Sequence, residues 1–515
     1  MKRILFCFTF IAMLISGCSN ESTGKKEDLD KKAETVQTVE DTEKENTEKQ
    51  EENVEEAIVF KKSTPIKMDK SLPLEPLDSF KTQTRENENE ASYHLDVTLK
   101  EDEVFDVKAN INIKNLSKDT WGDLIFYFIP NAFTEKNKPE FLESQAVVNI
   151  GEVLVDGKSV DYKLQKDTLQ LLLDHPLNPN QELNVEVAYS FTVPTNGIRF
   201  SKAGENSYLA QWYPMLSTYH SGWDKTDYEH GGESYHNDFS QFTVNYQLPD
   251  DYVVASSADN DPTQASSKGS LHGEEIKEFY ITFMKNMNVS KRVVDGTEIR
   301  VFSYKEEDLN RETYLNLAEE TLLFFNKNIG KYPHKQLDII MDQGGMEYPG
   351  IVTVSTSAAG DISHTVVHEM AHQWFYGMVN NHPYYTAWID EALTNYAAYL
   401  FFIKGKNQEP ISVFSRADAV IEMASDYGKM KPSNLSVPEY KGQPVSYSAS
   451  VYENSSLELW KLSDANADKG IEYLRNYFNL YSYKEVDANE WLRYTRSFFQ
   501  IKDVNQLSDW ISFEE

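Results

Sequence analysis

His368, Glu369 and His372, followed at a distance by Glu391, are the residues of this sequence best suited to chemistry. On a helix, positions four apart lie about 6 Å apart along the axis and face the same side. The imidazoles of His368 and His372 can therefore converge on one metal ion, and Glu391 offers a carboxylate as third ligand. Zinc held by two imidazoles and one carboxylate keeps one position open for water, as in hydrolytic sites. The spacing predicts a catalytic zinc site with Glu369 beside it.

Two helices have to hold these residues in place. Apolar residues surround the two histidines, as expected for a buried helix, and a second helix over residues 388–396 is expected to carry Glu391. His364 lies one turn before His368, but a fourth protein ligand would fill the water position, so we expect an ordinary polar residue there. Asn395, one turn after Glu391, could orient a ligand, or it could be an exposed or helix-packing amide.

The N-terminus has the pattern of an export signal. Lys2 and Arg3 precede an apolar run over residues 4–15, and small residues lead to Cys18. The run is too short to span a bilayer, which takes about 20 apolar residues. We predict a lipoprotein signal peptide over residues 1–17, a lipid on Cys18, and a location on the outer face of a bacterial cell membrane. An ordinary export signal with a chance cysteine is the alternative.

The next segment lacks the composition of a folded domain. Residues 19–56 contain no aromatic residue and have six lysines against fourteen acidic residues. Such a segment cannot bury enough apolar surface to fold. We predict a disordered acidic tether over residues 18–60. The net charge of −32 for the whole chain argues against nucleic acid as a partner.

The globular part changes its periodicity once. From residue 91 to 283, apolar and polar residues alternate as in half-buried strands. A helical stripe follows over residues 314–329, and helices dominate after residue 361. We predict a multidomain α+β protein, with a β-rich sandwich or saddle domain over residues 61–304 and a mixed α+β domain over residues 305–515 that contains the whole zinc site.

Three motifs together resemble the M1 family of zinc metallopeptidases, the gluzincins that include aminopeptidase N and leukotriene A4 hydrolase. The zinc motif with its continuation through Phe375 and the segment 388–391 are the most specific of them. The resemblance extends over residues 85–515. It implies a thermolysin-like catalytic domain, one zinc ion and peptide substrates, and it makes Glu369 the general base that takes a proton from water and passes it to the leaving amine.

The second motif covers residues 344–348, Gly-Gly-Met-Glu-Tyr, and resembles the exopeptidase motif Gly-x-Met-Glu-Asn of that family. The resemblance implies that Gly344 and Gly345 lie along the substrate backbone and that Glu347 binds the free α-amino group, since a desolvated carboxylate pairs well with an ammonium. Tyr348 departs from the asparagine of the family. Without the zinc motif, Glu347 would instead suggest a surface carboxylate.

The third motif is residues 451–454, similar to the family segment Val-Tyr-Glu-Lys-Gly, in which the tyrosine stabilises the oxyanion. The resemblance gives this role to Tyr452, although Asn454 departs from the family lysine and Tyr447 is a nearby competitor. In the β-rich domain, Gln211 starts a segment, Gln-Trp-Tyr-Pro, that looks like the place from which relatives send a polar side chain to the substrate amine.

The resemblance thus implies an aminopeptidase that acts on peptides outside the membrane. Because Tyr348 replaces the asparagine, an endopeptidase or a dedicated peptide-processing enzyme of the same fold remains an alternative. A non-catalytic peptide-binding scaffold is a third possibility, although each expected zinc ligand and the general base are present.

Overall fold

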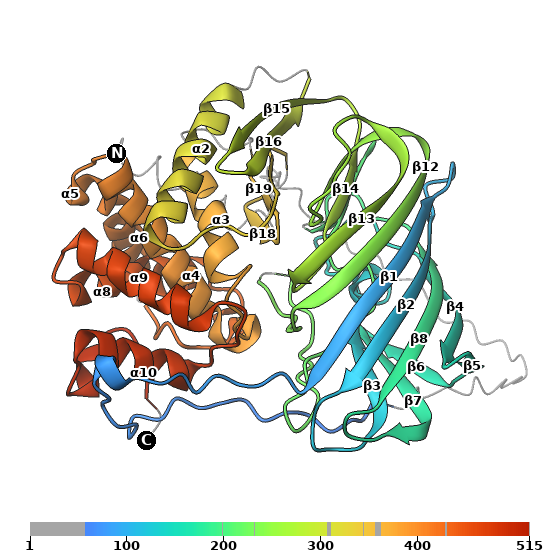
Figure 1. Cartoon of the computed structure of the whole chain (residues 1–515), viewed down its shortest axis with the longest axis horizontal. Helices are drawn as coiled ribbons and strands as arrows, with labels where there is room; N and C mark the ends of the chain where they lie inside the picture. Colours follow the sequence, from blue (N-terminus) through green and yellow to red (C-terminus); the bar gives the residue numbers. More distant parts are fainter. Residues whose placement is uncertain are drawn as a thin grey trace, which may run out of the picture.

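The computed structural model describes residues 57–197, 199–230, 232–305, 311–342, 344–355, 362–427 and 430–513. The predicted signal peptide, Cys18 and most of the predicted tether lie outside these ranges. Within them, no helix combines the length and apolar character that crossing a membrane requires. A β-rich part and a helical part lie on the right and left of Figure 1, as the alternating and then helical periodicity predicts.

Among the described residues, fourteen strands form the two sheets of the β-rich part. They are β1 (Asn89–Leu99), β2 (Phe105–Asn115), β3 (Trp121–Tyr127), β4 (Val148–Val155), β5 (Lys158–Ser159), β6 (Tyr162–Gln165), β7 (Thr168–Leu177), β8 (Glu182–Phe191), β9 (Phe200–Ala203), β10 (Asn206–Leu209), β11 (Met215–Leu216), β12 (Ser240–Ser256), β13 (Ser266–Ile276) and β14 (Ile281–Met284). The larger sheet has the order β5-β4-β8-β2-β1-β12-β14-β10-β9, with β13 paired to β12, and the smaller has the order β11-β3-β7-β6.

Alternation along the strands builds the core of this sandwich. In β1, Tyr93, Leu95 and Val97 are buried, while the residues between them are exposed or half-buried. These side chains share one hydrophobic core with Leu124 and Phe126 of β3 in the smaller sheet. The strands expected from the period-two pattern are therefore present, and they pack as two sheets face to face.

A third sheet shares its hydrophobic core with the helices. Its strands are β15 (Met287–Val294), β16 (Thr297–Tyr304), β17 (Gln336–Ile340), β18 (Met346–Tyr348) and β19 (Ile351–Thr353), in the order β15-β16-β17-β19-β18. β16 pairs with β17, so this sheet begins before the predicted domain boundary at residue 305. Alternation alone cannot tell which sheet a strand joins. β18 runs antiparallel to β19 and forms one edge of the sheet.

One helix, α2, lies between β16 and β17, and the other described helices follow the third sheet. The helices are α2 (Arg311–Asn328), α3 (Ser363–Phe375), α4 (Pro383–Leu400), α5 (Pro410–Val413), α6 (Ser415–Asp426), α7 (Pro444–Tyr447), α8 (Ser455–Leu462), α9 (Ala467–Tyr481) and α10 (Ala488–Phe499). Two π-helical segments, η3 (Phe401–Gly405) and η5 (Ser448–Asn454), and four 3-10 turns, η1 (Leu77–Ser79), η2 (Ile129–Phe133), η4 (Val437–Tyr440) and η6 (Val504–Leu507), complete the described elements.

An N-terminal strap, residues 61–88, crosses from the β-rich part to α10 (Figure 1). Arg493 of α10 forms an ion pair with Glu75 at 2.5 Å, and the Ser497 hydroxyl donates to the Glu75 carbonyl. Phe80 packs edge-on against Tyr494, with 6.0 Å between ring centroids. Part of the segment assigned to the β-rich domain therefore holds the two parts together.

Candidate active site

α3 places the two histidines of the zinc motif on one side of the helix. His368 and His372 are both buried, and their Nε2 atoms lie 3.1 Å apart. The rings are nearly perpendicular, with 4.8 Å between centroids. The four-residue spacing thus brings the two imidazole nitrogens to one point, as the sequence predicts.

α4 packs against α3 and brings in the third ligand. Glu391 Oε2 lies 3.2 Å from His368 Nε2 and 3.2 Å from His372 Nε2. Ligands of a tetrahedral zinc ion, at about 2.0–2.1 Å from the metal, lie about 3.3 Å from one another. The three donor atoms therefore have the spacing and the chemistry of a zinc site with a vacant fourth position. We call these residues the zinc triad.

Neighbouring groups orient the triad. Burial alone would raise the pKa of the Glu391 carboxyl, but the nearby imidazoles of His372 and His368 hold this pKa well below its usual range. On the far side of the His372 ring, Nδ1 lies 3.1 Å from the Thr394 hydroxyl. A partner on the second ring nitrogen fixes the orientation of a metal-binding imidazole, so Thr394 belongs to the site although the sequence did not suggest it.

Glu369 is buried beside the triad. Burial raises the pKa of its carboxyl to about 8, against the effect of His372, and the negative charge of Glu391 adds to the rise. Its side chain faces Gly345, where a Cβ atom would come within 2.6 Å of Glu369 Oε1. The general base predicted from the resemblance therefore lies between the triad and the glycine motif.

Tyr452 lies in the π-helical segment η5, and its hydroxyl donates a hydrogen bond to Glu391 Oε1 at 2.6 Å. Burial and the nearby Glu391 raise its pKa well above its usual value, so the hydroxyl stays protonated. π-helical segments are rare and occur often at functional sites. Tyr447 lines the same cleft, edge-on to Tyr452 with 5.7 Å between centroids, but of these two tyrosines it is Tyr452 that hydrogen-bonds to the triad.

Glu347 lies on β18 and is buried in the cleft. Burial raises the pKa of its carboxyl well above the usual value, and the carboxylates of Glu233 and Glu369 raise it further. The Gly344 carbonyl accepts a hydrogen bond from the Thr353 hydroxyl of β19, and Gly345, directly before β18, lines the cleft. Tyr348, which departs from the family motif, turns away and stacks on Tyr280 of the β-rich part at 4.2 Å.

Of the predicted zinc, catalytic and substrate-binding residues, Gly344 does not line the cleft, and neither does Gln211. The Gln211 amide donates to Glu278 at 2.7 Å and to the Tyr235 hydroxyl at 3.1 Å, and the side chain is fully buried. The β-rich part instead contributes Glu233 and Arg199 to the cleft. A glutamate and an arginine far from any motif give no signal in the sequence, which is why both were missed.

Glu233 and Arg199 form a buried ion pair, with 3.1 Å between Arg199 Nη1 and Glu233 Oε1. Burial raises the pKa of Glu233 despite this partner, and its second oxygen has no hydrogen-bond partner among the described residues. Asp390, next to Glu391, also lines the cleft. The cleft therefore combines a cation-binding triad with several desolvated carboxyl groups, an environment that favours positively charged groups.

Two polar residues near the triad lie outside it. The His364 ring, one turn before His368, has its Nδ1 2.9 Å from Arg416 Nη1, so it does not fill the fourth position. The Asn395 amide donates to the Tyr452 carbonyl at 3.3 Å and to the Ser456 hydroxyl at 3.1 Å. It therefore connects α4 to the π-helical segment instead of touching a ligand.

Comparisons with known proteins agree with this geometry. Residues 313–510 match the Peptidase family M1 domain. The chain is 23% identical to Aminopeptidase 2 of Candida albicans over 306 residues, which cover 52% of this chain and 32% of that protein. It is 32% identical to human Aminopeptidase B over 98 residues, 18% of this chain and 15% of that protein. The chain thus spans well under half of the length of these relatives.

Solved structures share the fold over most of the chain. An M1 zinc metallopeptidase from Deinococcus radiodurans has a TM-score of 0.61 and 14% identity, over 83% of this chain and 95% of that one. Native yeast LTA4 hydrolase has a TM-score of 0.59 and 14% identity, over 86% of this chain and 71% of that one. Residues 313–510 thus resemble the peptidase family M1 domain in sequence, and the chain shares the fold of these M1 and LTA4 hydrolase structures.

Proposed function

We propose that this chain is a zinc-dependent aminopeptidase, which removes the first residue from peptides with a free N-terminus. One arrangement carries the proposal: the zinc triad, Glu369 and Glu347 line the same cleft. The curated relatives reported above are named aminopeptidases, and a structure of the Deinococcus radiodurans metallopeptidase is described as bound to a Tyr-Ser-Ala substrate.

Glu347 and Glu233 give the cleft its preference for an amine. Both carboxyl groups are buried, and both have raised pKa values because burial disfavours their charged form. A substrate ammonium would offset that cost, since charge-assisted hydrogen bonds are strong in desolvated surroundings. Glu233 comes from the β-rich part and Glu347 from β18, so the two parts of the chain would bind the amine together.

The edge of β18 can hold the peptide backbone. Within the described strands, β18 pairs with β19 alone. An extended peptide can add to such an edge through main-chain hydrogen bonds. Since Glu347 lies on this strand, binding of the amine and alignment of the backbone would fix the scissile bond relative to Glu369.

Glu369 and Tyr452 supply the proton transfers and the oxyanion contact. When bound, zinc provides a Lewis acid and lowers the pKa of water. Glu369, which is buried beside the triad and Gly345, takes a proton from the attacking water and passes it to the leaving amine. The protonated Tyr452 hydroxyl donates a hydrogen bond to the oxyanion of the tetrahedral intermediate.

The decisive experiment compares one peptide with a free N-terminus and the same peptide N-acetylated, with and without a chelator. We expect stepwise release of N-terminal residues from the free peptide alone, and loss of this activity on chelation. Glu347→Gln should raise KM for the free peptide strongly, whereas Glu312→Gln, an exposed glutamate on α2, should not. Equal cleavage of both peptides would overturn the aminopeptidase proposal.

Endopeptidase action is the second candidate, and Tyr348 is the observation that favours it. The side chain at the position of the family asparagine is buried against Tyr280, so it cannot contact a substrate in the way a polar side chain at the cleft would. Internal cleavage of the acetylated peptide, lost in Glu369→Gln, would support this reading. Peptide binding without cleavage of either substrate would support a scaffold.

We also propose that the protein is lipid-anchored on the outer face of the membrane. The support is the sequence alone: basic residues, an apolar run and a small-residue site that ends at Cys18. Cells that express the full chain should incorporate labelled fatty acid into it, and Cys18→Ala should abolish incorporation. Labelling that persists in Cys18→Ala would contradict the anchor.

A further inference from the structure

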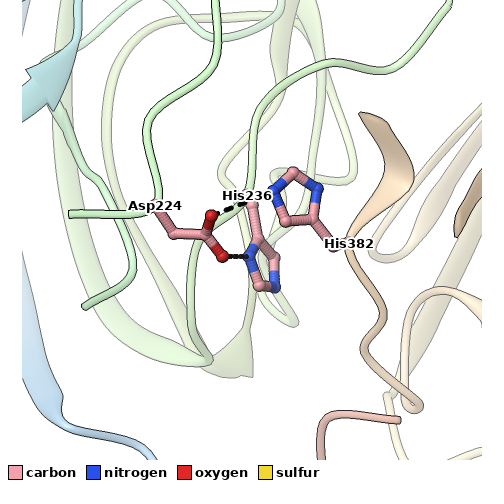
Figure 2. A group of neighbouring side chains, drawn as sticks. All are labelled: Asp224, His236 and His382. Atoms are coloured by element: carbon pink, nitrogen blue, oxygen red, sulfur yellow. Dashed lines mark hydrogen bonds and ion pairs between the residues drawn. The ribbon is translucent and has the colours of Figure 1, made fainter. Parts of the chain in front are cut away.

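Three metal-binding side chains converge at a second place, outside the cleft (Figure 2). Asp224 Oδ2 lies 3.1 Å from His236 Nδ1, and Asp224 Oδ1 lies 3.2 Å from His382 Nε2. The two imidazole rings lie 4.5 Å apart between centroids. All three residues are buried. This donor set, two imidazoles and one carboxylate, has the same composition as the zinc triad.

The three residues come from both parts of the chain. Asp224 and His236 lie in the connection between β11 and β12 of the β-rich part, and His382 is the residue directly before α4. α4 carries Glu391, nine residues after His382. Whatever holds His382 against Asp224 therefore fixes the start of the helix that supplies the third ligand of the zinc triad.

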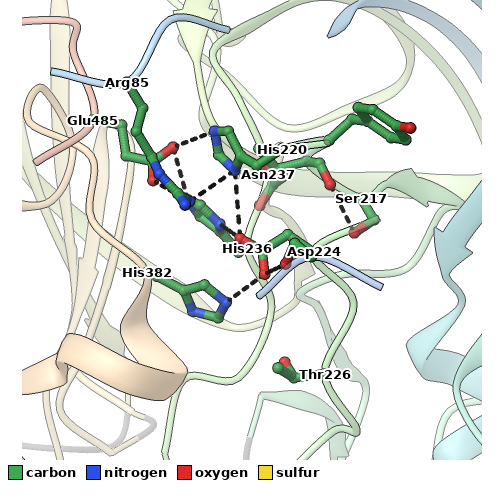
Figure 3. Close-up of polar contacts among 12 residues, drawn as sticks. Arg85, Ser217, His220, Asp224, Thr226, His236, Asn237, His382 and Glu485 are labelled. Atoms are coloured by element: carbon green, nitrogen blue, oxygen red, sulfur yellow. Dashed lines mark hydrogen bonds and ion pairs between the residues drawn. The ribbon is translucent and has the colours of Figure 1, made fainter. Parts of the chain in front are cut away.

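A second layer of polar residues surrounds the cluster (Figure 3). His236 Nε2, on the far side of its ring, lies 3.6 Å from Glu485 Oε2, and His220 Nε2 lies 3.2 Å from the same oxygen. Arg85 of the N-terminal strap lies 3.1 Å from His220 Nδ1. A carboxylate behind a histidine is the usual second partner of a metal-binding imidazole, and Glu485 holds that position behind His236.

Hydrogen bonds alone leave the two imidazoles of this cluster incomplete. His236 Nε2 and His382 Nδ1 are buried and have no hydrogen-bond partner among the described residues. Buried polar groups without partners are costly. A cation between Asp224 and the two imidazoles would fix His236 as the tautomer that donates from Nε2 to Glu485. It would also balance the negative charge of Asp224, since Glu485 already has Arg85 at 3.6 Å.

We propose that Asp224, His236 and His382 bind a second divalent transition-metal ion, with zinc as the best match to the donors, and that this ion clips the β-rich part to the start of α4. Asp224 Oδ1 lies next to His382 and Oδ2 next to His236, so the carboxylate can bind through both oxygens and complete four donor atoms with two nitrogens. Outside this set, the Ser63 hydroxyl donates to Asp224 Oδ1 at 2.7 Å, and His220 Nδ1 lies 3.6 Å from Oδ2. Asp224, His236 and His382 do not line the substrate cleft, so the ion would have a structural role.

We call Asp224, His236 and His382 the clip. The metal content of the chain tests for an ion there without substitutions at these three residues. The full chain, stripped with a chelator and re-equilibrated by dialysis against micromolar zinc, should hold two zinc ions per chain by mass spectrometry of the metal. His368→Gln combined with His372→Gln, which removes the zinc triad, should keep one. A stoichiometry of one in the unaltered chain and none in this double variant would overturn the proposal.

The complementary variants remove the clip. Asp224→Asn combined with His382→Gln should hold one zinc ion, and adding both triad substitutions should leave none. In the triad-less variant, saturation with zinc should also raise Tm, because an ion that binds only the folded state stabilises it, and cobalt should give the visible absorption of a nitrogen- and oxygen-bound tetrahedral site. Two zinc ions in the clip variant, or a Tm that zinc does not change in the triad-less variant, would contradict a clip at these residues.

Discussion

Gly345 lies so close to Glu369 that a Cβ atom on the glycine would come within 2.6 Å of Glu369 Oε1. The glycine precedes β18 and the glutamate lies on α3, so the contact joins the sheet edge to the zinc helix. The resemblance to an exopeptidase motif assigned Gly345 a contact with the substrate backbone. The structure adds a second reason for a glycine here, since any side chain would displace the general base.

Gly345→Ala should therefore lower kcat while the chain stays folded and binds zinc. The added methyl group meets the end of a flexible side chain, so Glu369 can move aside at a small cost in stability. Displacing a reacting group by about 1 Å costs on the order of 100-fold in rate. We expect a fall of that size in kcat, measured on an aminoacyl reporter, with zinc content and Tm nearly unchanged.

Gly122→Ala is the matched control, because a Cβ atom at Gly122 in β3 meets nothing within 4 Å. It should leave kcat and KM unchanged. If Gly345→Ala were as active as Gly122→Ala, the contact with Glu369 would have no catalytic consequence.

Tyr452→Phe should lose far more activity than Tyr447→Phe, although both tyrosines are half-buried and line the cleft. Of the two hydroxyls, it is that of Tyr452 that donates a hydrogen bond to Glu391 Oε1, at 2.6 Å. Loss of one oxyanion donor typically lowers kcat by about 100-fold to 1000-fold. We expect this loss for Tyr452→Phe with KM little changed, and a loss of less than about 10-fold for Tyr447→Phe. The reverse order would assign the oxyanion contact to Tyr447.

The spacing of His368 and His372 predicted that they meet, because residues four apart on a helix lie on the same side of it. His368 and His372 meet for this reason, and the α3 pattern needed no tertiary knowledge. Glu391 was also predictable, since it lies on a helix whose apolar residues had to pack against α3. The alternation in β1, β2, β8 and the first part of β12 followed from the same kind of local rule.

Residues that reach the cleft by tertiary folding could not be predicted. Glu233 and Arg199 come from irregular connections of the β-rich part, where neither periodicity nor spacing marks a residue as functional. Gln211 is a residue that the sequence suggested for the cleft, because its segment is similar to one in the family. Its side chain turns instead toward Glu278 and Tyr235. Which way a loop residue points depends on its backbone, and Gln211 has a φ of 48°.

Thr394→Val should weaken zinc binding. The Thr394 hydroxyl lies 3.1 Å from His372 Nδ1, and a valine of similar shape removes this partner without opening a cavity. Loss of such an outer contact typically costs about 10-fold to 100-fold in metal affinity. Competition with a chelator of known affinity should show this fall, while kcat at saturating zinc changes little.

Thr321→Val provides the comparison for that experiment. Thr321 is also a buried helical threonine, but its hydroxyl donates to the Leu317 carbonyl of its own helix, α2. Its replacement should leave zinc affinity unchanged. An unaltered affinity in Thr394→Val as well would show that His372 keeps its orientation without the hydroxyl.

Arg300→Met should destabilise the fold by about 3–5 kcal/mol, because it leaves two buried carboxyl groups without their cation. Arg300 of β16 lies 2.6 Å from Asp261 of the β-rich part and 2.5 Å from Asp338 of β17, and all three are buried. Lys61→Met, which breaks an exposed ion pair with Asp119, should change the free energy of unfolding by less than about 1 kcal/mol.

The loss of unfolding free energy in Arg300→Met should depend on pH. The two carboxyl groups decide whether this loss grows or shrinks as pH rises. Burial already raises the pKa of Asp261 to about 7 and raises that of Asp338, although Arg300 lowers both. Without the guanidinium these folded-state pKa values rise further above the unfolded value of about 3.9. At low pH the two carboxyl groups are protonated and neutral, so burying them costs little. As pH rises through the folded-state pKa they become charged, and the free energy of unfolding falls. Urea unfolding should therefore show a smaller loss at pH 5 than at pH 8, and an equal loss at both would mean that the carboxyl groups escape burial once Arg300 is gone.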